Sequence, residues 1–216
     1  MGTLWFIALL AAPAPVRVPV AFHVPTVGGT PVVDAPWLDL RIQEANRVFE
    51  PHGVRFERVA VLPRAQGPAA GTRADRDALA AHQRPGVVNV HVVTHLMDIH
   101  QAGRPRQGVH WKVREAGRPR RTRFVILAAY SSPGVLGHEL GHYLGQAPHS
   151  DQPDNLMSYT RTGQRAPFLT DAQGRRMRAT ARRLLRQGVL AADKLARPML
   201  PESGATNPRG GTHDHP

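Results

Sequence analysis

The segment 138–142, with the sequence HELGH, restricts the fold of this chain more than any other feature. Its two histidines are four positions apart, so on an α-helix they share one face and lie about 6 Å apart along the axis. Two imidazoles placed in this way can reach a single metal ion. Gly145 comes three residues after His142, and a glycine there favours the left-handed conformation that ends a helix. His149 follows as a third imidazole, so the segment predicts a helix, a sharp turn and a metal site.

The acidic residue inside this segment indicates catalysis rather than a purely structural metal. Glu139 is too close in sequence to His138 to share its coordination easily, but it can reach a water molecule on the metal. That is the position of a general base. Histidine nitrogens are typical ligands of Zn²⁺, and catalytic zinc sites keep one open position for water. We therefore expect one catalytic zinc ion as the cofactor.

Hydrophobic periodicity predicts mixed secondary structure around this helix. Ser132 and Pro133 favour a helix start at these residues, and Thr170 with Gln173 resembles a capping box that opens a strongly basic helix. The expected fold class is α/β (α+β): a mixed twisted sheet, an active-site helix and a helical C-terminal half. The expected strands are 16–24, 54–62, 86–93, 109–114 and 123–129, and the expected earlier helices are 34–51 and 74–82.

A second motif, Asn155-Leu156-Met157-Ser158-Tyr159, follows the third histidine. The chain resembles the metzincin clan of zinc endopeptidases in the order of three features: HELGHYLG, then a histidine, then NLMSY. The branches of this clan include serralysins, astacins, pappalysins and matrixins. The resemblance covers about residues 132–160. It implies a three-imidazole site, with Met157 in a tight turn beneath the metal as a packing support. The Met-x-Tyr form is similar to the first three branches, in which the tyrosine ligates the zinc or stabilises the oxyanion, and Tyr159 matches it.

The third ligand departs from the clan pattern, which places a histidine three residues after the glycine. That position is Pro148 here, and His149 is one residue later. A turn tolerates one additional residue, so His149 is the expected ligand, with Asp151 as the alternative because carboxylates also bind zinc. A different zinc-peptidase layout would need a glutamate ligand on a later helix. The only glutamate after Glu139 is Glu202, near the C-terminus, so that layout is close to excluded.

Together these features predict a zinc metalloendopeptidase that acts on a protein or peptide substrate. A zinc-bound water activated by Glu139 would attack the peptide carbonyl, and Tyr159 would stabilise the oxyanion. Two other functions stay open: a catalytically idle metzincin-like binding domain, and a basic nucleic-acid-binding protein in which the HELGH segment is accidental. Residues 158–170 are expected to form the wall that selects substrate side chains, and the sequence does not reveal their preference.

The charge of the chain is strongly positive, at +12 with 28 Lys and Arg. The arginines are spread along the chain and are densest at 118–123 and 175–186, without a helix-turn-helix, RNA-binding or zinc-finger pattern beside them. We therefore expect a solvated basic surface and no specific nucleic-acid partner. Cysteine is absent, which excludes disulfides and cysteine-ligated metals. A calcium ion at Asp151 and Asp154 is less favoured than a role for Asp154 in ordering its turn.

The expected domain organisation is simple. Residues 1–14 resemble a short, atypical signal peptide, residues 15–200 form one metzincin-like catalytic domain, and residues 201–216 form a disordered tail. A chain with this leader is secreted or periplasmic. No apolar run of about 18 residues is present, so no membrane span is expected. We expect a monomer.

Overall fold

The computed structural model describes residues 14–65, 69–113, 122–145, 148–191 and 193. The expected tail, 201–216, lies outside the described residues, as does the expected signal peptide apart from Ala14. No helix in the described part of the chain is long and apolar enough to span a membrane.

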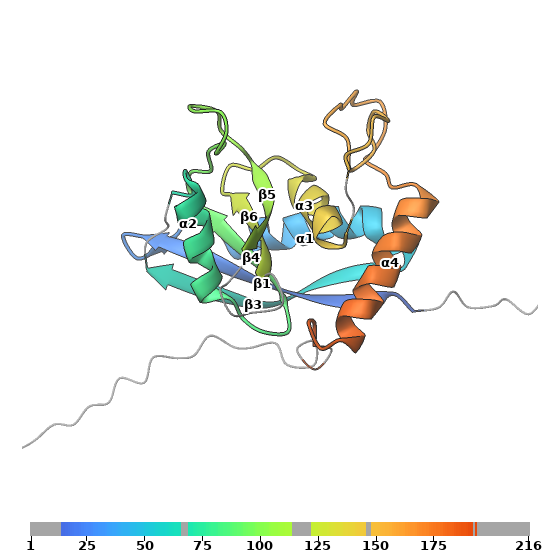
Figure 1. Ribbon diagram of the computed structural model, residues 1–216, viewed down its shortest axis with the longest axis horizontal. Helices are drawn as coiled ribbons and strands as arrows, with labels where there is room; N and C mark the ends of the chain where they lie inside the picture. Colours follow the sequence, from blue (N-terminus) through green and yellow to red (C-terminus); the bar gives the residue numbers. More distant parts are fainter. Residues whose placement is uncertain (1–13, 66–68, 114–121, 146–147, 192, 194–216) are drawn as a thin grey trace, which may run out of the picture.

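One mixed sheet organises the described residues (Figure 1). Its strands are β1 (Val16–Val27), β2 (Thr30–Pro31), β3 (Val54–Ala65), β4 (Val88–Val93), β5 (Gly108–Val113) and β6 (Thr122–Ala128). The strand order is β2-β1-β4-β6-β5, with β3 paired to β1. Strands β1, β3, β4 and β6 are mutually parallel, whereas β5 runs antiparallel to β6 and forms one end of the sheet.

Four α-helices pack around this sheet in the described residues: α1 (Ala35–Phe49), α2 (Arg73–Ala78), α3 (Val135–Tyr143) and α4 (Asp171–Arg186). Short 3₁₀ turns, η1 (Glu50–His52) and η2 (Leu79–His82), extend α1 and α2. Figure 1 shows α1 and α3 near the centre of the molecule, with α2 and α4 flanking them on opposite sides. The mixed sheet and its helices confirm the predicted α/β fold class.

The hydrophobic core lies on both faces of the sheet. Alternate residues of β1, such as Val18, Val20 and Phe22, point into the larger cluster, to which α1, α3 and α4 also contribute. A second cluster on the other face joins Phe124 and Ile126 of β6 to residues of η2 and of the following loop. All six residues of β4 are buried, as expected of a central parallel strand.

Local signals in the sequence explain where α1 and α4 begin and where η1 ends. Asp34 accepts a hydrogen bond from the Trp37 amide and so caps α1, and Gly53 closes η1 with a φ of 72°. Thr170 and Gln173 form the predicted capping box of α4, with both reciprocal hydrogen bonds present. The start of α4 packs close to η1, and a Cβ atom at Gly174 would overlap the ring of His52.

Candidate metal centre

Helix α3 begins two residues later than the sequence predicts. Gly134 takes the N-cap position with a φ of 83°, and the first helical residue is Val135. The expected cap at Ser132 is therefore wrong: the Ser132 amide instead donates to the Gln107 side chain at 2.7 Å. A residue in the left-handed region cannot continue a right-handed helix, so the helix starts only after Gly134. The helix still ends as predicted, because Gly145 has a φ of 91°.

Three histidines, here called the histidine triad, are brought together at the open side of α3: His138, His142 and His149. The Nε2 atom of His142 lies 3.1 Å from the Nε2 atom of His138 and 3.1 Å from that of His149. Two nitrogens bound tetrahedrally to one zinc ion at about 2.0–2.1 Å would be about 3.3 Å apart. The triad therefore has the donor type and the spacing that a metal such as zinc requires.

The additional residue before His149 does not carry this side chain away from the triad. Asp151, the alternative ligand in the sequence prediction, is not in the group of described residues whose ligand atoms meet here. Asp154 is buried and accepts hydrogen bonds from the amide and hydroxyl of Thr162. These bonds hold the pKa of Asp154 below its ordinary value. The carboxylate is thus used to order its turn, as the sequence predicts, although its φ of 60° is unusual for a residue other than glycine.

His138 is oriented by the backbone of the turn that follows the triad. Its Nδ1 lies 2.7 Å from the carbonyl oxygen of Leu156, to which it donates a hydrogen bond in the tautomer that leaves Nε2 free. A second hydrogen bond of this kind commonly fixes the ring of a metal-binding histidine. Burial lowers the pKa of His138 to about 4, so the imidazole is neutral near pH 7 and available as a ligand.

Glu139 is held between α3 and the sheet edge. Its side chain is buried, and its carboxylate accepts a hydrogen bond from the backbone N–H of His110 in β5. Burial raises the pKa of Glu139 to about 7, and a cation at the triad would lower it again. The close approach depends on Gly108, because a Cβ atom there would lie 2.9 Å from the Cγ of Glu139 and 2.6 Å from the Cγ1 of Val135.

Met157 lies directly beneath α3, where it is fully buried. A Cβ atom at Gly141 would lie 2.5 Å from the Met157 sulfur, so a larger residue at that helix position would displace the Met157 side chain. The turn around Met157 is closed by a 2.8 Å hydrogen bond from the Ser158 amide to the carbonyl of Asn155. The Asn155 side chain accepts from the Met157 amide and also bonds Gln173. Gln173, which belongs to the capping box of α4, therefore also supports the turn below the triad.

Tyr159 lies at the rim of the site and is 71% exposed. Its ring centroid is 4.2 Å from that of His149 and 5.7 Å from that of His138. The phenol therefore faces the same open space as the triad. A cleft of about 380 Å³ occupies that space, bounded by the triad, Glu139, Tyr159 and β5.

The structure also reveals a supporting residue that sequence reasoning missed. Arg161 donates hydrogen bonds to the carbonyls of Asn155 at 2.7 Å and Leu156 at 3.1 Å. The Leu156 carbonyl is the one that orients His138. No sequence signal marks Arg161, because it is one of many arginines and its role depends on the path of an irregular loop.

Comparison with known proteins gives matches in structure only. No family model and no curated protein sequence matches this chain. Metalloproteinase-II from Bacteroides fragilis matches with a TM-score of 0.56 and 16% identity, over 79% of this chain and 55% of that chain. Mature mirolysin from Tannerella forsythia, in complex with a cleaved peptide, matches with a TM-score of 0.60 and 12% identity, over 83% of this chain and 100% of that chain. The fold of this chain is similar to the folds of these two metalloproteinases.

The structural likeness extends well beyond the 132–160 segment on which the sequence resemblance to the metzincin clan depends. The matched share is 79% or 83% of this chain, so the predicted fold is confirmed as similar to that of these metalloproteinases. The chain spans about half the length of the Bacteroides fragilis protein. At these identities the likeness establishes the fold, and the chemistry has to be argued from the site.

Proposed function

We propose that this chain is a zinc-dependent endopeptidase with one catalytic zinc ion held by His138, His142 and His149. The observation that carries the proposal is the arrangement of three imidazole nitrogens around one point of a cleft, with the buried carboxylate of Glu139 beside them. A structural zinc site would be closed on all sides, whereas this one opens toward a cleft. The neighbouring metalloproteinase structures support the same interpretation.

Glu139 is proposed as the general base and then the general acid. When bound, zinc would supply Lewis acidity, polarising a carbonyl and making a coordinated water easier to deprotonate. Glu139 accepts the proton of the attacking water as the C–O bond forms. It then delivers this proton to the amine nitrogen as the C–N bond breaks. The hydrogen bond from the His110 backbone fixes the carboxylate beside the triad, where it can accept and return a proton.

Tyr159 and strand β5 are proposed to hold the substrate. The Tyr159 hydroxyl has no hydrogen-bond partner among the described residues, and its ring contacts His149, so it is placed to donate to the developing oxyanion. Strand β5 ends the sheet on the side of the cleft. An extended peptide that pairs with this edge would lie across the triad, which is a common mode of peptide recognition. The mirolysin structure contains a cleaved peptide, which supports a peptide substrate for this chain as well.

The decisive experiment compares the zinc-supplemented protein with the isosteric variant Glu139→Gln on a mixed peptide library. Cleavage by the wild type alone, with equal zinc content in both proteins, is the expected result. Cleavage by both proteins would remove Glu139 from the mechanism. Cleavage by neither, with zinc bound, would favour a catalytically idle binding domain.

The organisation of the whole chain is part of the same proposal. Residues 15–200 would form the catalytic domain, residues 1–14 a signal peptide that directs export, and residues 201–216 a disordered tail. The exported enzyme would act as a monomer. N-terminal sequencing of the secreted protein tests the first cleavage site, and its mass in solution tests the oligomeric state.

A further inference from the structure

A second cleft, here called the basic cleft, lies at the opposite end of β5 from Gly108. It has a volume of about 790 Å³ and forms where β4 begins, β5 ends and β6 begins, beside the C-terminal ends of α3 and α4. Four cationic side chains line it, and none of the described lining residues is Asp or Glu. These cations are Arg84, Lys112, Arg123 and Arg183.

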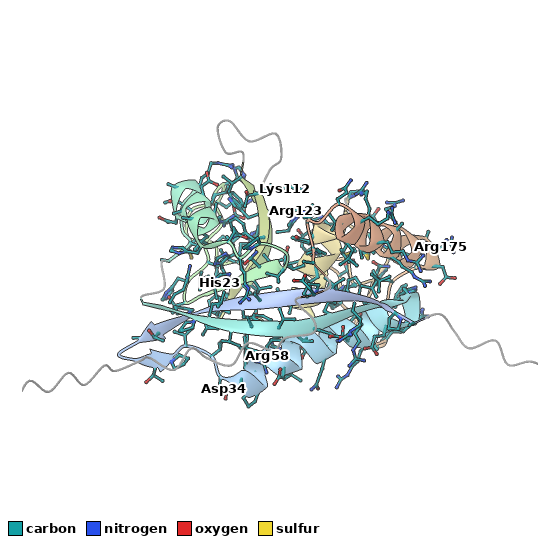
Figure 2. All side chains as sticks on the ribbon, turned by 90° about the horizontal axis from the view of Figure 1, so that it is seen from below. His23, Asp34, Arg58, Lys112, Arg123 and Arg175 are labelled. Carbon is teal, nitrogen blue, oxygen red and sulfur yellow. The ribbon has the colours of Figure 1, made fainter. Side chains whose placement is uncertain are left out.

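The fold holds these charges close together, and two of them have no ion pair with a described residue. Lys112 and Arg123 are direct partners in the antiparallel β5–β6 register, where like charges are unfavourable. Figure 2 shows the two labelled side chains next to one another on the edge of the molecule between α2 and α4. Neither Lys112 nor Arg183 forms an ion pair with a described residue. An anionic ligand in the basic cleft would relieve the repulsion between Lys112 and Arg123.

One of the four cations is fixed in place by its neighbours. Arg123 donates a hydrogen bond to the Tyr143 carbonyl at 3.2 Å, and its guanidinium carbon lies 4.5 Å from the centre of the Tyr143 ring. The carbonyl belongs to the last residue of α3, where a cation is favoured by the helix dipole. This contact anchors the floor of the basic cleft to the helix that bears His138 and His142.

Strand β5 connects the basic cleft to the metal centre. His110 binds Glu139 through its backbone, and Lys112, two residues further along the strand, lines both clefts. Two residues of a strand span about 7 Å. A peptide that pairs with β5 and has its reacting bond near Glu139 would therefore bring residues about three or more positions away to the basic cleft.

We propose that the basic cleft binds acidic side chains of the polypeptide that lies along β5. The enzyme would then prefer substrates with a cluster of Asp or Glu a few residues from the cleaved bond, on the side of Lys112. This inference deepens the proposed function and rests on it, because β5 is the track that joins the two clefts. A nucleic acid fits less well: the aromatic residue in the described lining, Tyr143, is only 2% exposed and gives bases no stacking surface.

The first test measures binding without cleavage. A fluorescein-labelled peptide with four consecutive glutamates joined to a neutral segment is titrated into the zinc-supplemented Glu139→Gln protein, beside the same peptide with glutamines. We expect the glutamate peptide to bind at least about tenfold more tightly at low salt, with the difference shrinking as salt is added. Equal binding of the two peptides would overturn the proposal.

Matched charge variants locate the binding surface. Arg183→Gln removes a charge from the basic cleft, and Arg175→Gln removes the same charge from the same helix, about 12 Å away along its axis. Figure 2 shows Arg175 at the far end of α4 from Arg123. Arg183→Gln, and independently Lys112→Gln, should weaken the glutamate peptide several-fold, while Arg175→Gln should not. Equal weakening by all three would indicate general attraction to a basic protein, and the proposed cleft would be wrong.

A competing oligonucleotide tests the identity of the ligand. A single-stranded DNA with as many charges as the peptide should compete less well than the unlabelled glutamate peptide. If the DNA competes better, and Arg183→Gln weakens it equally, the basic cleft is a nucleic-acid site and the polypeptide assignment is wrong.

Cleavage by the wild type separates this proposal from the proposed function. Peptides with one cleavable core carry the glutamate block on the N-terminal side, on the C-terminal side, or not at all. We expect a higher kcat/KM for one side only, mainly through KM, and loss of that preference in Arg183→Gln with the neutral peptide unaffected. Cleavage without any such preference would overturn this inference and leave the proposed function standing. Failure to cleave any peptide would overturn the proposed function. The binding experiment would still decide whether the basic cleft binds acidic side chains.

Discussion

Two histidine clusters in this molecule use the same side chain in opposite ways. The histidine triad turns three Nε2 atoms toward one point of an open cleft. The second cluster, His23 and His91, lies on neighbouring strands β1 and β4, where the rings stack with centroids 4.2 Å apart. Their ring nitrogens face polar side chains instead: His23 lies 2.8 Å from Asn89, and His91 lies 2.8 Å from Gln83.

The comparison teaches that the direction and the partners of the ring nitrogens decide whether histidines can bind a metal. Both clusters are close-packed, and burial lowers the pKa of His23 to about 4 and of His91 to about 2. The buried pair is therefore neutral near pH 7, as a metal ligand must be. It still belongs to no group of described residues that could hold a metal. Neutral histidines are necessary for a metal site, but three convergent, accessible nitrogens are what distinguish the triad.

The largest effect should come from removing one member of the triad. His142→Ala leaves only two of the three imidazoles, so we expect loss of most bound zinc and of detectable peptidase activity. His91→Gln, a change in the buried pair, should keep the zinc content of the wild type. Zinc content after dialysis measures both proteins. Retention of zinc by His142→Ala, or its loss from His91→Gln, would break the distinction between the two clusters.

The next largest effect should come from Glu139→Gln. The amide keeps the shape of the side chain but cannot accept the proton of water, so kcat should fall by about 10²–10⁴-fold while zinc binding is retained. Steady-state kinetics and metal analysis on one preparation separate the two properties. A proportional loss of zinc would show that the residue supports the metal rather than the chemistry.

A smaller effect is expected from Arg161→Gln. This change removes two hydrogen bonds to the turn below the triad, including the one to the carbonyl that orients His138. Loss of such outer support typically lowers metal affinity about 10–100-fold, and we expect the lower end because Arg161 acts through the backbone. Competition with a zinc chelator measures the affinity, and Arg165→Gln serves as an exposed control. Unchanged affinity would limit Arg161 to a role in the loop.

The buried pair should produce a modest dependence of stability on pH. An unfolded histidine has a pKa of about 6.5, whereas burial, with repulsion from Arg64 as a smaller cause, holds both folded values lower. Below pH of about 6.5 the unfolded chain therefore binds protons that the folded chain does not, and the free energy of unfolding falls as the pH is lowered. The stabilising contribution of the two neutral histidines is fully present above that pH. It declines until the pH reaches about 4 for His23 and about 2 for His91.

Urea unfolding of the zinc-free protein between about pH 7.5 and about pH 5 measures this slope. In His91→Gln the slope should be shallower by about one proton, because the other titrating groups are common to both proteins. Identical slopes would mean that His91 is protonated in the folded state, contrary to its burial among cations.

Most of the metal centre could be predicted from the sequence because its parts are local. His138, Glu139 and His142 occupy one face of one helix, so their relation follows from helix geometry alone. The asparagine-led turn at Met157 also follows a short motif. His149 is the expected third ligand, with Asp151 as the alternative, because its one-residue displacement departs from the clan pattern. The path of a chain after a glycine is not determined by residue type, so only the structure places His149 beside the other two histidines.

By itself, the sequence determined the order of the longer strands and helices, the starts of α1 and α4, and the chemistry that the HELGH segment can support. These features depend on periodicity, capping residues and spacing within a few turns, which are short-range properties. Only the tertiary structure decided that Gly108 lets β5 approach Glu139, that Arg161 supports the turn beneath the triad, and that four cations meet at the end of β5. These contacts join residues far apart in the chain, and their geometry arises only when the sheet and helices pack.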